Sequence, residues 1–322
     1  MIGIAGAGAF GTALAITLGR EGRAVQLWAR DPEIAVTTQS TRRNKARLPD
    51  VAIPPSVQVT GNIDDLRGAD AVLLTMPMQV LHGFLQRHAG ILNGLPIIAC
   101  CKGIDLATLK GPSSLIQQTC ADSTVAQLTG PSFATDIAYG LPTALTLACK
   151  DDGAGEALQK LISTPSLRVY RTSDVIGAEL GGALKNVIAI AAGIVVGAGL
   201  GESARAALMT RGYAEMVRFG LRLGGRAETL AGLSGLGDLV LTCTSVQSRN
   251  FRHGLAMGRG ELPDAAATVE GVATAQAVIK QSIRFAMASV MPVTAMVASV
   301  TTGQITVAEA VQALMSRPLK QE

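Results

Sequence analysis

The sequence predicts an α/β domain over residues 1–172, followed by an all-α domain over residues 173–322. Short apolar runs of strand length alternate with helical patterns as far as about residue 172, and only helical patterns follow. The length of 322 residues is typical of two domains. With 48% hydrophobic and 16% charged residues, the chain can bury a core in each of them.

The first fourteen residues carry the strongest motif. Ile2–Ala5 is a short apolar run, Gly6, Gly8 and Gly11 follow at G-x-G-x-x-G spacing, and a helical pattern begins directly afterwards. A strand, a glycine turn and a helix in this order are typical of a Rossmann-type domain that binds a dinucleotide at the helix N-terminus. We expect Gly6 to form the turn, Gly8 to admit the pyrophosphate and Gly11 to allow close packing of helix and strand. The alternative is a glycine-rich turn in an ordinary α/β domain.

The other elements of the first domain follow from apolar runs and caps. Asn62 can cap a short helix that ends at Leu66, and Pro32 and Pro77 can open helices, the second with Val80, Leu81, Phe84 and Leu85 at helical spacing. A helix is expected over 151–162. The continuous apolar run 71–75 is typical of a parallel sheet covered on both faces. Besides the first, the expected strands are 24–29, 56–60, 71–75, 96–101, 125–129, 142–148 and 167–170.

Arg30 follows the second strand, nineteen residues after Gly11. An acidic residue at this place binds the ribose 2′-OH of NAD, whereas an arginine can pair with the 2′-phosphate of NADP. Asp31 stands one place later and is as consistent with capping the helix that opens at Pro32 as with binding the ribose. We therefore expect NADP(H) as the cofactor, with NAD(H) as a second one. The alternative for Arg30 is a solvated strand end. The basic residues of the following loop form either a basic lip beside the cofactor or a solvated surface; they are Arg42, Arg43, Lys45 and Arg47.

Two further segments follow expected strands, where ligands of open α/β sheets bind. Lys102 comes after 96–101, and Gly130 and Ser132 come after 125–129. Lys102 is as consistent with a surface lysine as with a functional one.

The second half contains one charged residue in an unusual setting. Lys185 lies within an apolar helix expected to run from Ser173 to about Gly201. It is either a proton donor whose basicity burial lowers, or a lysine whose stem covers the core while its ammonium reaches water. More helices are expected over 204–223, 249–257, 268–286, 292–300 and 307–315.

Two polar segments separate these helices. The glycines of 233–243 indicate backbone close to a ligand, with Asp238 as the only charge. Ser248, Arg249 and Asn250 stand at a helix start, which suits a phosphate group. The alternative role of Ser248 is to cap that helix.

Composition excludes several other classes. A net charge of +4 and 3% aromatic residues give no platform for nucleic acid. The five cysteines show no C-x-x-C pair, which predicts reduced thiols in the cytoplasm and neither disulfides nor a metal site. We expect no signal peptide. The longest uncharged run, 186–201, is shorter than the roughly 20 residues that cross a bilayer, so no membrane span is expected.

Several motifs together resemble the bacterial NAD(P)-dependent glycerol-3-phosphate dehydrogenases. The resemblance covers nearly the whole length and implies an α/β Rossmann-type domain, an all-α substrate domain like the C-terminal domain of 6-phosphogluconate dehydrogenase, and a homodimer. The implied reaction is reversible NAD(P)H-dependent reduction of dihydroxyacetone phosphate to sn-glycerol 3-phosphate for phospholipid synthesis. The motifs are 6–14, 101–104, 130–134, 184–187, 235–242, 248–250 and 269–272.

The resemblance also implies roles for single residues. Lys185 is the general acid and base. The implied substrate positions are Lys102, Gly130, Ser132, Lys185, Asp238, Ser248, Arg249 and Asn250. The implied cofactor positions are Gly6, Gly8, Ala9, Phe10, Gly11, Arg30, Lys102, Ala134, Arg249, Thr268 and Glu270.

The sequence departs from the family pattern at three places: Ala9 stands for a usual serine, Thr268 for a hydrophobic residue and Asp136 for a glutamate. The loss of the serine hydroxyl at Ala9 leaves the affinity for the cofactor open. Two other functions stay open at this point: a β-hydroxyacid dehydrogenase of the same architecture and a non-catalytic NADP(H)-sensing protein.

Overall fold

The computed structural model describes residues 1–265 and 267–316, which form two compact units. Unit 1 contains Met1–Lys102 and Lys110–Glu179, and unit 2 contains Gly103–Leu109 and the described residues from Leu180 onward. The division therefore differs from the expected one after residue 172. Glu179 groups with unit 1 because its carboxylate accepts the backbone N–H of Ser113 at 2.6 Å. Gly103–Leu109 groups with unit 2 because Ile104 and Leu109 are buried in the helical core.

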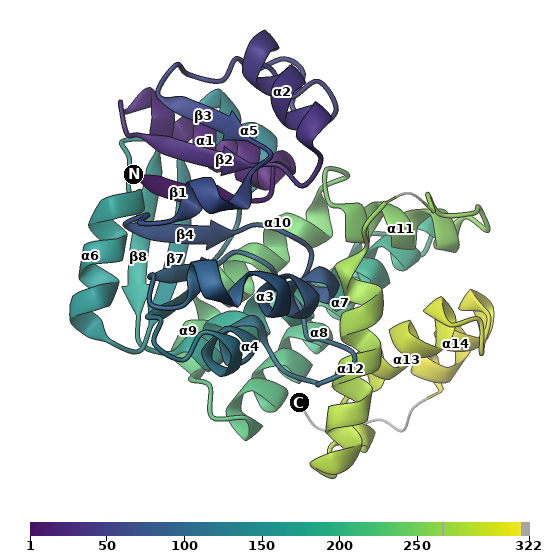
Figure 1. Cartoon of the computed structure of the whole chain (residues 1–322). Coiled ribbons are helices and arrows are strands. Elements are labelled where there is room, and N and C mark those ends of the chain that lie inside the picture. Colours follow the sequence, from purple (N-terminus) through teal and green to yellow (C-terminus); the bar gives the residue numbers. More distant parts are fainter. Residues whose placement is uncertain (266, 317–322) are drawn as a thin grey trace. The chain divides into compact units, whose positions relative to one another are not determined.

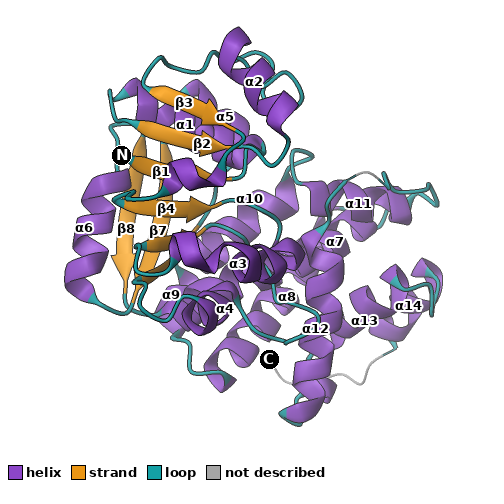
Figure 2. Cartoon of the chain, in the orientation of Figure 1, coloured by secondary structure: helices purple, strands orange, loops and turns teal. Residues whose placement is uncertain are grey.

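Unit 1 is built on an eight-stranded sheet in the order β3-β2-β1-β4-β5-β6-β7-β8 (Figures 1 and 2). The first six strands are parallel, which confirms the Rossmann-type class; β7 is antiparallel to β6, and β8 is parallel to β7. Strand order reverses beside β1, where ligands of such sheets bind. The strands are β1 (Ile2–Ala5), β2 (Val25–Trp28), β3 (Val57–Thr60), β4 (Ala71–Leu74), β5 (Ile97–Ala99), β6 (Val125–Thr129), β7 (Thr143–Cys149) and β8 (Leu167–Thr172).

Helices cover both faces of this sheet, so each face has its own apolar core. One core includes Leu14 and Ile137, and the other includes Phe84 and Ile116. Val80 was one of the four apolar residues at helical spacing in α3, but this residue is 38% exposed and does not belong to the buried face. Helices α4 and α5 were not predicted from the sequence. The helices of unit 1 are α1 (Ala9–Arg20), α2 (Pro32–Thr41), η1 (Ile63–Leu66), α3 (Met78–Leu92), α4 (Pro112–Thr119), α5 (Ala134–Tyr139) and α6 (Asp152–Ile162).

Unit 2 is all-helical in its described residues, as predicted. Its central helix, α7 (Val175–Gly197), begins in unit 1. The others are α8 (Glu202–Arg222), α9 (Ala227–Ala231), η2 (Leu233–Gly237), α10 (Asp238–Thr244), α11 (Arg249–Gly258), α12 (Glu270–Arg284), η3 (Ala288–Val290), α13 (Pro292–Thr301) and α14 (Val307–Met315).

Helix α7 is long and apolar enough to cross a membrane by length and composition alone. Its most apolar window is 83% buried inside the structure, however. A helix that is apolar on all sides is also what the core of a large helical unit requires. Core burial therefore accounts for the composition of α7.

A buried carboxylate fixes the start of α13. Glu215 on α8 accepts the backbone N–H groups of Val293 at 2.6 Å and of Thr294 at 3.1 Å, and also the Thr294 hydroxyl at 2.9 Å. Burial raises the pKa of Glu215 above its ordinary value of 4.5, although these hydrogen bonds and Arg218 act in the opposite direction. The carboxyl group of Glu215 therefore stays protonated to a higher pH in the native state than in the unfolded chain.

The raised pKa predicts a pH dependence of stability. The contribution of Glu215 to the free energy of unfolding is largest below the unfolded pKa and decreases as the pH rises through the folded pKa. We expect Glu215→Gln to reduce the difference between the unfolding free energies measured by denaturant titration at about pH 5 and about pH 8. The exposed Glu228→Gln is the control. If the difference between the two unfolding free energies were as large in Glu215→Gln as in the wild type, protonation of Glu215 would not be its cause.

Candidate active site

Glycine is needed for different structural reasons at the three positions of the first turn. Gly6 has φ +121°, and a Cβ there would lie 2.8 Å from the Thr75 hydroxyl. A Cβ on Gly11 would lie 2.1 Å from the Gly6 carbonyl oxygen. A Cβ on Gly8 would meet no described protein atom within 4 Å. Internal packing therefore requires Gly6 and Gly11, whereas the space beside Gly8 remains for a ligand.

The start of α1 fits an anionic ligand. Gly8 is its N-cap, and no side chain caps the helix within the described residues. The first N–H groups of a helix have no partner inside the helix, and they carry its positive dipole end. With the space beside Gly8, these groups fit the pyrophosphate of a dinucleotide. Ala9 and Phe10 form the first turn, and Ala134 opens α5; all three pack against the core of this sheet face.

Arg30 is exposed just after β2, where a cofactor ribose would be recognised. The loop after α2 is not a uniform basic lip, because Arg42 is bonded inside it. Its guanidinium donates to the carbonyl oxygens of Ile53 at 3.3 Å and Val57 at 2.8 Å, and to Gln39 Oε1 at 2.9 Å. Asp31 caps α2 through the N–H groups of Glu33 and Ile34, as predicted.

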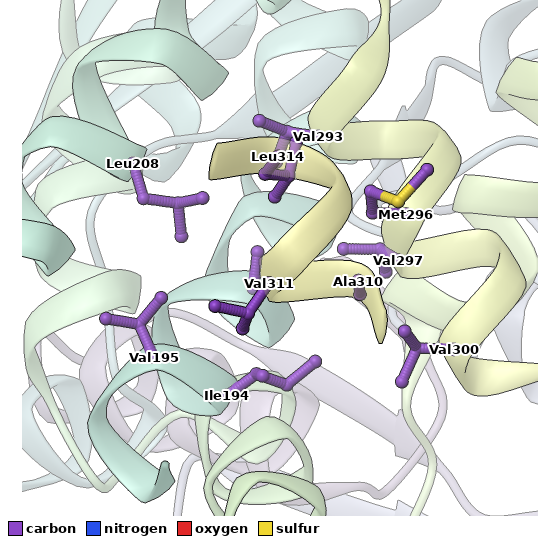
Figure 3. A pocket seen from close by; sticks show the side chains of 11 residues that line it. Ile194, Val195, Leu208, Val293, Met296, Val297, Val300, Ala310, Val311 and Leu314 are labelled. Atoms are coloured by element: carbon purple, nitrogen blue, oxygen red, sulfur yellow. The ribbon is translucent and has the colours of Figure 1, made fainter. Parts of the chain in front are cut away.

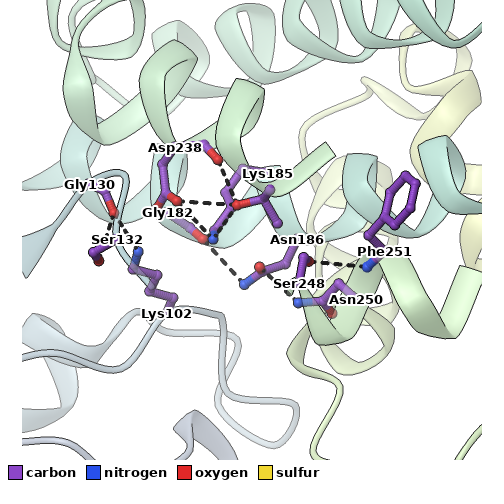
Figure 4. A network of polar contacts seen from close by, with 11 residues as sticks. Lys102, Gly130, Ser132, Gly182, Lys185, Asn186, Asp238, Ser248, Asn250 and Phe251 are labelled. Atoms are coloured by element: carbon purple, nitrogen blue, oxygen red, sulfur yellow. Dashed lines mark hydrogen bonds and ion pairs between the residues drawn. The ribbon is translucent and has the colours of Figure 1, made fainter. Parts of the chain in front are cut away.

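Lys102, Gly130 and Ser132 meet at the carboxyl edge of the sheet. Lys102 Nζ donates to the Gly130 carbonyl at 3.1 Å, and Ser132 Oγ donates to the same oxygen at 3.3 Å (Figure 4). Sequence reasoning missed Gln127, a buried residue of β6 whose Nε2 donates at 3.0 Å to the carbonyl of Cys101, just before Lys102. Its amide ties the ends of β5 and β6 together.

The carboxyl edge also contains unsatisfied buried atoms. Gln127 Oε1 and Thr129 Oγ1 have no hydrogen-bond partner among the described residues, and both side chains are 1% exposed. Buried polar atoms are almost always satisfied in native proteins. Polar groups of a ligand or water suit this edge of the sheet.

In unit 2, Lys185 lies in a polar network and does not snorkel to water. The residue is 8% exposed, and its Nζ lies 3.0 Å from Asp238 Oδ1. It also donates to Thr242 Oγ1 at 2.8 Å, and the Thr242 hydroxyl donates to the Asp238 carbonyl oxygen at 2.6 Å (Figure 4). A buried ammonium needs a paired carboxylate of this kind. Asp238 and Thr242 thus hold the ammonium in one place. Sequence reasoning missed Thr242; its i+4 spacing from Asp238 was the available signal.

The glycine-rich segment before Asp238 is not an open ligand loop. Leu233–Gly237 forms a π-helical turn that continues into α10, whose first residue is Asp238. A Cβ on Gly235 would lie 1.9 Å from the Leu230 carbonyl oxygen, and one on Gly181 would lie 2.5 Å from the Ser234 carbonyl oxygen. Packing on Leu230 is a sufficient reason for Gly235, and its role beside a ligand stays a prediction. Gly181 lets the backbone of η2 pack against α7, and Gly235 lets it pack against the end of α9. This packing places Asp238 opposite Lys185.

Helix α11 packs directly on α7 as well. A Cβ on Gly193 would lie 2.1 Å from the Phe251 carbonyl oxygen, and one on Gly254 would lie 2.0 Å from the Ile190 carbonyl oxygen. This close crossing brings Asn250 to Asn186, with Nδ2 of Asn250 donating to Oδ1 of Asn186 at 2.9 Å.

Asn250 ties three helices together. Its Oδ1 accepts the backbone N–H of Gly271 in α12 at 2.9 Å. Because this acceptor and one N–H of the Asn250 amide serve the protein, Asn250 has a packing role beside any role in binding. Glu270, the first residue of α12, is positioned by the same contact.

The start of α11 carries Ser248, Arg249 and Asn250, the residues expected to hold a phosphate group. Ser248 is the N-cap and its Oγ accepts the Phe251 N–H at 3.2 Å, so its capping role is confirmed. Arg249 is exposed at the first helical position. Thr268 is exposed in the loop before α12. These positions leave Arg249 accessible to a ligand.

An apolar pocket in unit 2 is unsuited to this chemistry. It lies among α7, α8, α13 and α14 and is lined by residues such as Ile194, Leu208, Val297 and Val311 (Figure 3). None of its lining side chains can pair with a phosphate. The polar network around Lys185 is therefore the chemically competent part of unit 2.

Comparison with known proteins identifies the family. The family model described as the NAD-dependent glycerol-3-phosphate dehydrogenase N-terminus matches residues 1–154, and the corresponding C-terminus model matches residues 174–312. The chain belongs to this family. The earlier resemblance is thereby confirmed.

Individual relatives agree with the family match over the full length. The chain is 59% identical to a glycerol-3-phosphate dehydrogenase [NAD(P)+] of Cereibacter sphaeroides, with 100% of both chains covered. It is 56% identical to that of Paracoccus denitrificans, covering 100% of this chain and 99% of the relative. A crystal structure of glycerol-3-phosphate dehydrogenase from Coxiella burnetii has a TM-score of 0.93 at 36% identity, with 98% of each chain covered. Family membership favours a glycerol-3-phosphate dehydrogenase over the β-hydroxyacid dehydrogenase and the non-catalytic sensor.

Proposed function

We propose that this chain is an NAD(P)H-dependent glycerol-3-phosphate dehydrogenase. It catalyses sn-glycerol 3-phosphate + NAD(P)+ ⇌ dihydroxyacetone phosphate + NAD(P)H + H+. The observation that carries the chemistry is the buried Lys185 ammonium, held at 3.0 Å from Asp238 and 2.8 Å from Thr242. A family member with this network retains the proton donor that a ketone reduction needs.

The cofactor is assigned to residues 1–172, a dinucleotide domain. The space at Gly8 and the uncapped start of α1 fit a pyrophosphate. When bound, NAD(P)H supplies the hydride for the ketone carbon. Arg30 would pair with the 2′-phosphate. The remaining cofactor positions are Gly6, Ala9, Phe10, Gly11, Lys102, Ala134, Arg249, Thr268 and Glu270.

The proton transfer is assigned to Lys185. Its ammonium donates a hydrogen bond to the ketone oxygen and gives up a proton as negative charge develops there. Asp238 compensates the buried charge and Thr242 fixes the position of Nζ. In the oxidative direction the neutral amine takes the hydroxyl proton of glycerol 3-phosphate.

The substrate phosphate is assigned to the start of α11. Arg249 offers a forked donor, and the first N–H groups of the helix add their dipole. Ser248 and Asn250 complete this set from residues 173–322, the substrate domain. From the first domain, Lys102, Gly130 and Ser132 are assigned to the polar end of the substrate.

The setting of the enzyme follows from the same assignment. We place it in the cytoplasm, with five buried free cysteines that suit reducing conditions. It acts as a homodimer without a membrane span or a nucleic-acid partner, and it supplies glycerol 3-phosphate to phospholipid synthesis.

A direct assay tests the function. NADPH oxidation is followed with dihydroxyacetone phosphate and, separately, with several β-keto acids. Turnover that depends on dihydroxyacetone phosphate is expected. Turnover with only a β-keto acid would favour the β-hydroxyacid dehydrogenase, and NADPH binding without turnover of any substrate would favour the sensor.

The role of Arg30 predicts a change of cofactor preference. Arg30→Asp removes a partner of the 2′-phosphate and adds a like charge, so we expect NADPH to lose at least roughly tenfold more affinity than NADH does. Fluorescence titration of both cofactors measures this ratio. Arg87→Asp, an equal charge reversal on the exposed face of α3, is the control. Equal losses for both cofactors in Arg30→Asp would show that Arg30 does not read the 2′-phosphate.

A further inference from the structure

Asn44, in the loop between α2 and β3, is bonded to the glycine turn although it lies far from it in sequence. It is 1% exposed. Its Nδ2 donates to the carbonyl oxygen of Ala7 at 2.9 Å and to Oγ1 of Thr12 at 2.9 Å. Both hydrogens of its amide nitrogen are therefore directed at the segment between Gly6 and the first turns of α1.

The loop that carries Asn44 is itself held firmly. Arg42 adopts a left-handed conformation with φ 52°, which costs a non-glycine residue energy and persists where the surrounding contacts compensate for it. Its guanidinium donates to the carbonyl oxygen of Ile53 in the loop at 3.3 Å and to that of Val57, the first residue of β3, at 2.8 Å. The apolar side chains of Leu48, Val51 and Ile53 anchor the loop in the core of unit 1. These contacts hold the loop, and with it Asn44, in one position.

The bond to Ala7 has a consequence for the neighbouring donor. The Ala7–Gly8 peptide is trans, because the structure has no cis peptide bond in its described residues. In a trans peptide, the carbonyl and the following N–H point in opposite directions. By holding the Ala7 oxygen, Asn44 therefore fixes the direction of the Gly8 N–H. The bond to Thr12 fixes the same loop relative to the first turns of α1.

We propose that Asn44 is a positioning residue that pre-orients the Gly8 N–H and the start of α1 for the pyrophosphate of the dinucleotide. This rests on the proposed cofactor site. Asn44 does not bind the ligand through Nδ2, because both N–H groups are used by Ala7 and Thr12. Preorganised donors bind an anion more tightly because no ordering cost is left to the binding step.

The test separates the pyrophosphate from the rest of the cofactor. Three ligands are titrated against the full chain: NADPH, 2′-phospho-ADP-ribose, which contains the pyrophosphate, and adenosine 2′-phosphate, which lacks both phosphates of the pyrophosphate. We expect Asn44→Leu, a nearly isosteric change, to raise Kd for the first two at least about tenfold, equivalent to about 1.4 kcal/mol. For adenosine 2′-phosphate we expect a change below about twofold, because that fragment has no phosphate at its 5′ end to accept the Gly8 N–H.

A milder variant keeps the test valid if Asn44→Leu folds poorly. Thr12→Val removes only one of the two acceptors, and we expect it to raise Kd for the pyrophosphate ligands about threefold, in the same selective pattern. Thr17→Val makes the same change further along α1 and serves as the matched control. Arg43→Ala, an exposed residue next to Asn44, controls for the loop.

Two outcomes would overturn the proposal. Equal losses for all three ligands would show that Asn44 only supports the fold, and unchanged affinities would show that the turn needs no such support. Failure of the proposed cofactor site is distinguishable, because the wild-type chain would then bind none of the three ligands. Failure of the proposed reaction is distinguishable as well, because it would appear only in the turnover assay.

Discussion

Lys185→Met is expected to lower kcat for the reduction of dihydroxyacetone phosphate by at least roughly a hundredfold, the usual scale for a lost general acid. The residue is 8% exposed, and its Nζ is held by Asp238 and Thr242, so Met in its place offers no proton donor at this position. The affinity for NADPH, measured by fluorescence titration, should change less than about threefold, because the ammonium acts on the ketone oxygen.

Lys185→Met is also expected to lower the stability of the fold, because it leaves the buried charge of Asp238 uncompensated. The double variant Lys185→Met/Asp238→Asn removes both charges and is expected to be as inactive as the single variant while unfolding closer to the wild-type temperature. Lys280→Met, an exposed lysine on α12, is the matched control and should keep full activity. Near-normal kcat in a folded Lys185→Met chain would refute the assignment.

Arg249→Ala is expected to raise KM for dihydroxyacetone phosphate at least roughly tenfold, equivalent to about 1.4 kcal/mol of charge-assisted bonding. Arg249 is exposed at the first position of α11, and Ser248 caps that helix. A phosphate offers three acceptor oxygens and about two charges, and the guanidinium fork matches two of those oxygens. A carboxylate substrate would use less of this site.

The loss should be largely absent with unphosphorylated dihydroxyacetone, for which kcat/KM is compared in wild type and variant. Arg259→Ala removes an equal charge at the other end of the same helix and is the matched control. Because Arg249 is also assigned to the cofactor, the affinity for NADPH is titrated separately. If wild type and variant discriminate equally between the two ketones, Arg249 does not bind the phosphate.

The sequence by itself determined the order of elements and much of the chemistry. Strands β1 and β6 and helix α14 have the predicted bounds, because their apolar runs are framed by glycine, proline or capping residues. The glycine spacing indicated the dinucleotide turn, and Lys185 was recognisable as the single cation of an apolar helix. Such signals are local, so one chain suffices to read them.

Short or irregular elements could not be predicted from the sequence. Helices α4 and α5 have 8 and 6 residues, too few for a helical period to stand out. The segment around Gly235 had the composition of a loop but packs as a π-helical turn, because small residues also serve where backbones touch. In such cases composition alone does not distinguish a ligand from a neighbouring helix.

Only the tertiary structure decided which polar groups meet. Lys185 and Asp238 are 53 residues apart in the sequence numbering (238 − 185), and their pairing depends on glycines that let η2 approach α7. Asn44 and Ala7 are 37 residues apart, and their bond depends on the fold of the loop around Arg42. A hydrogen bond or ion pair needs its atoms within about 3 Å of each other. Spacing along the chain cannot encode that distance, because packing of whole elements sets it.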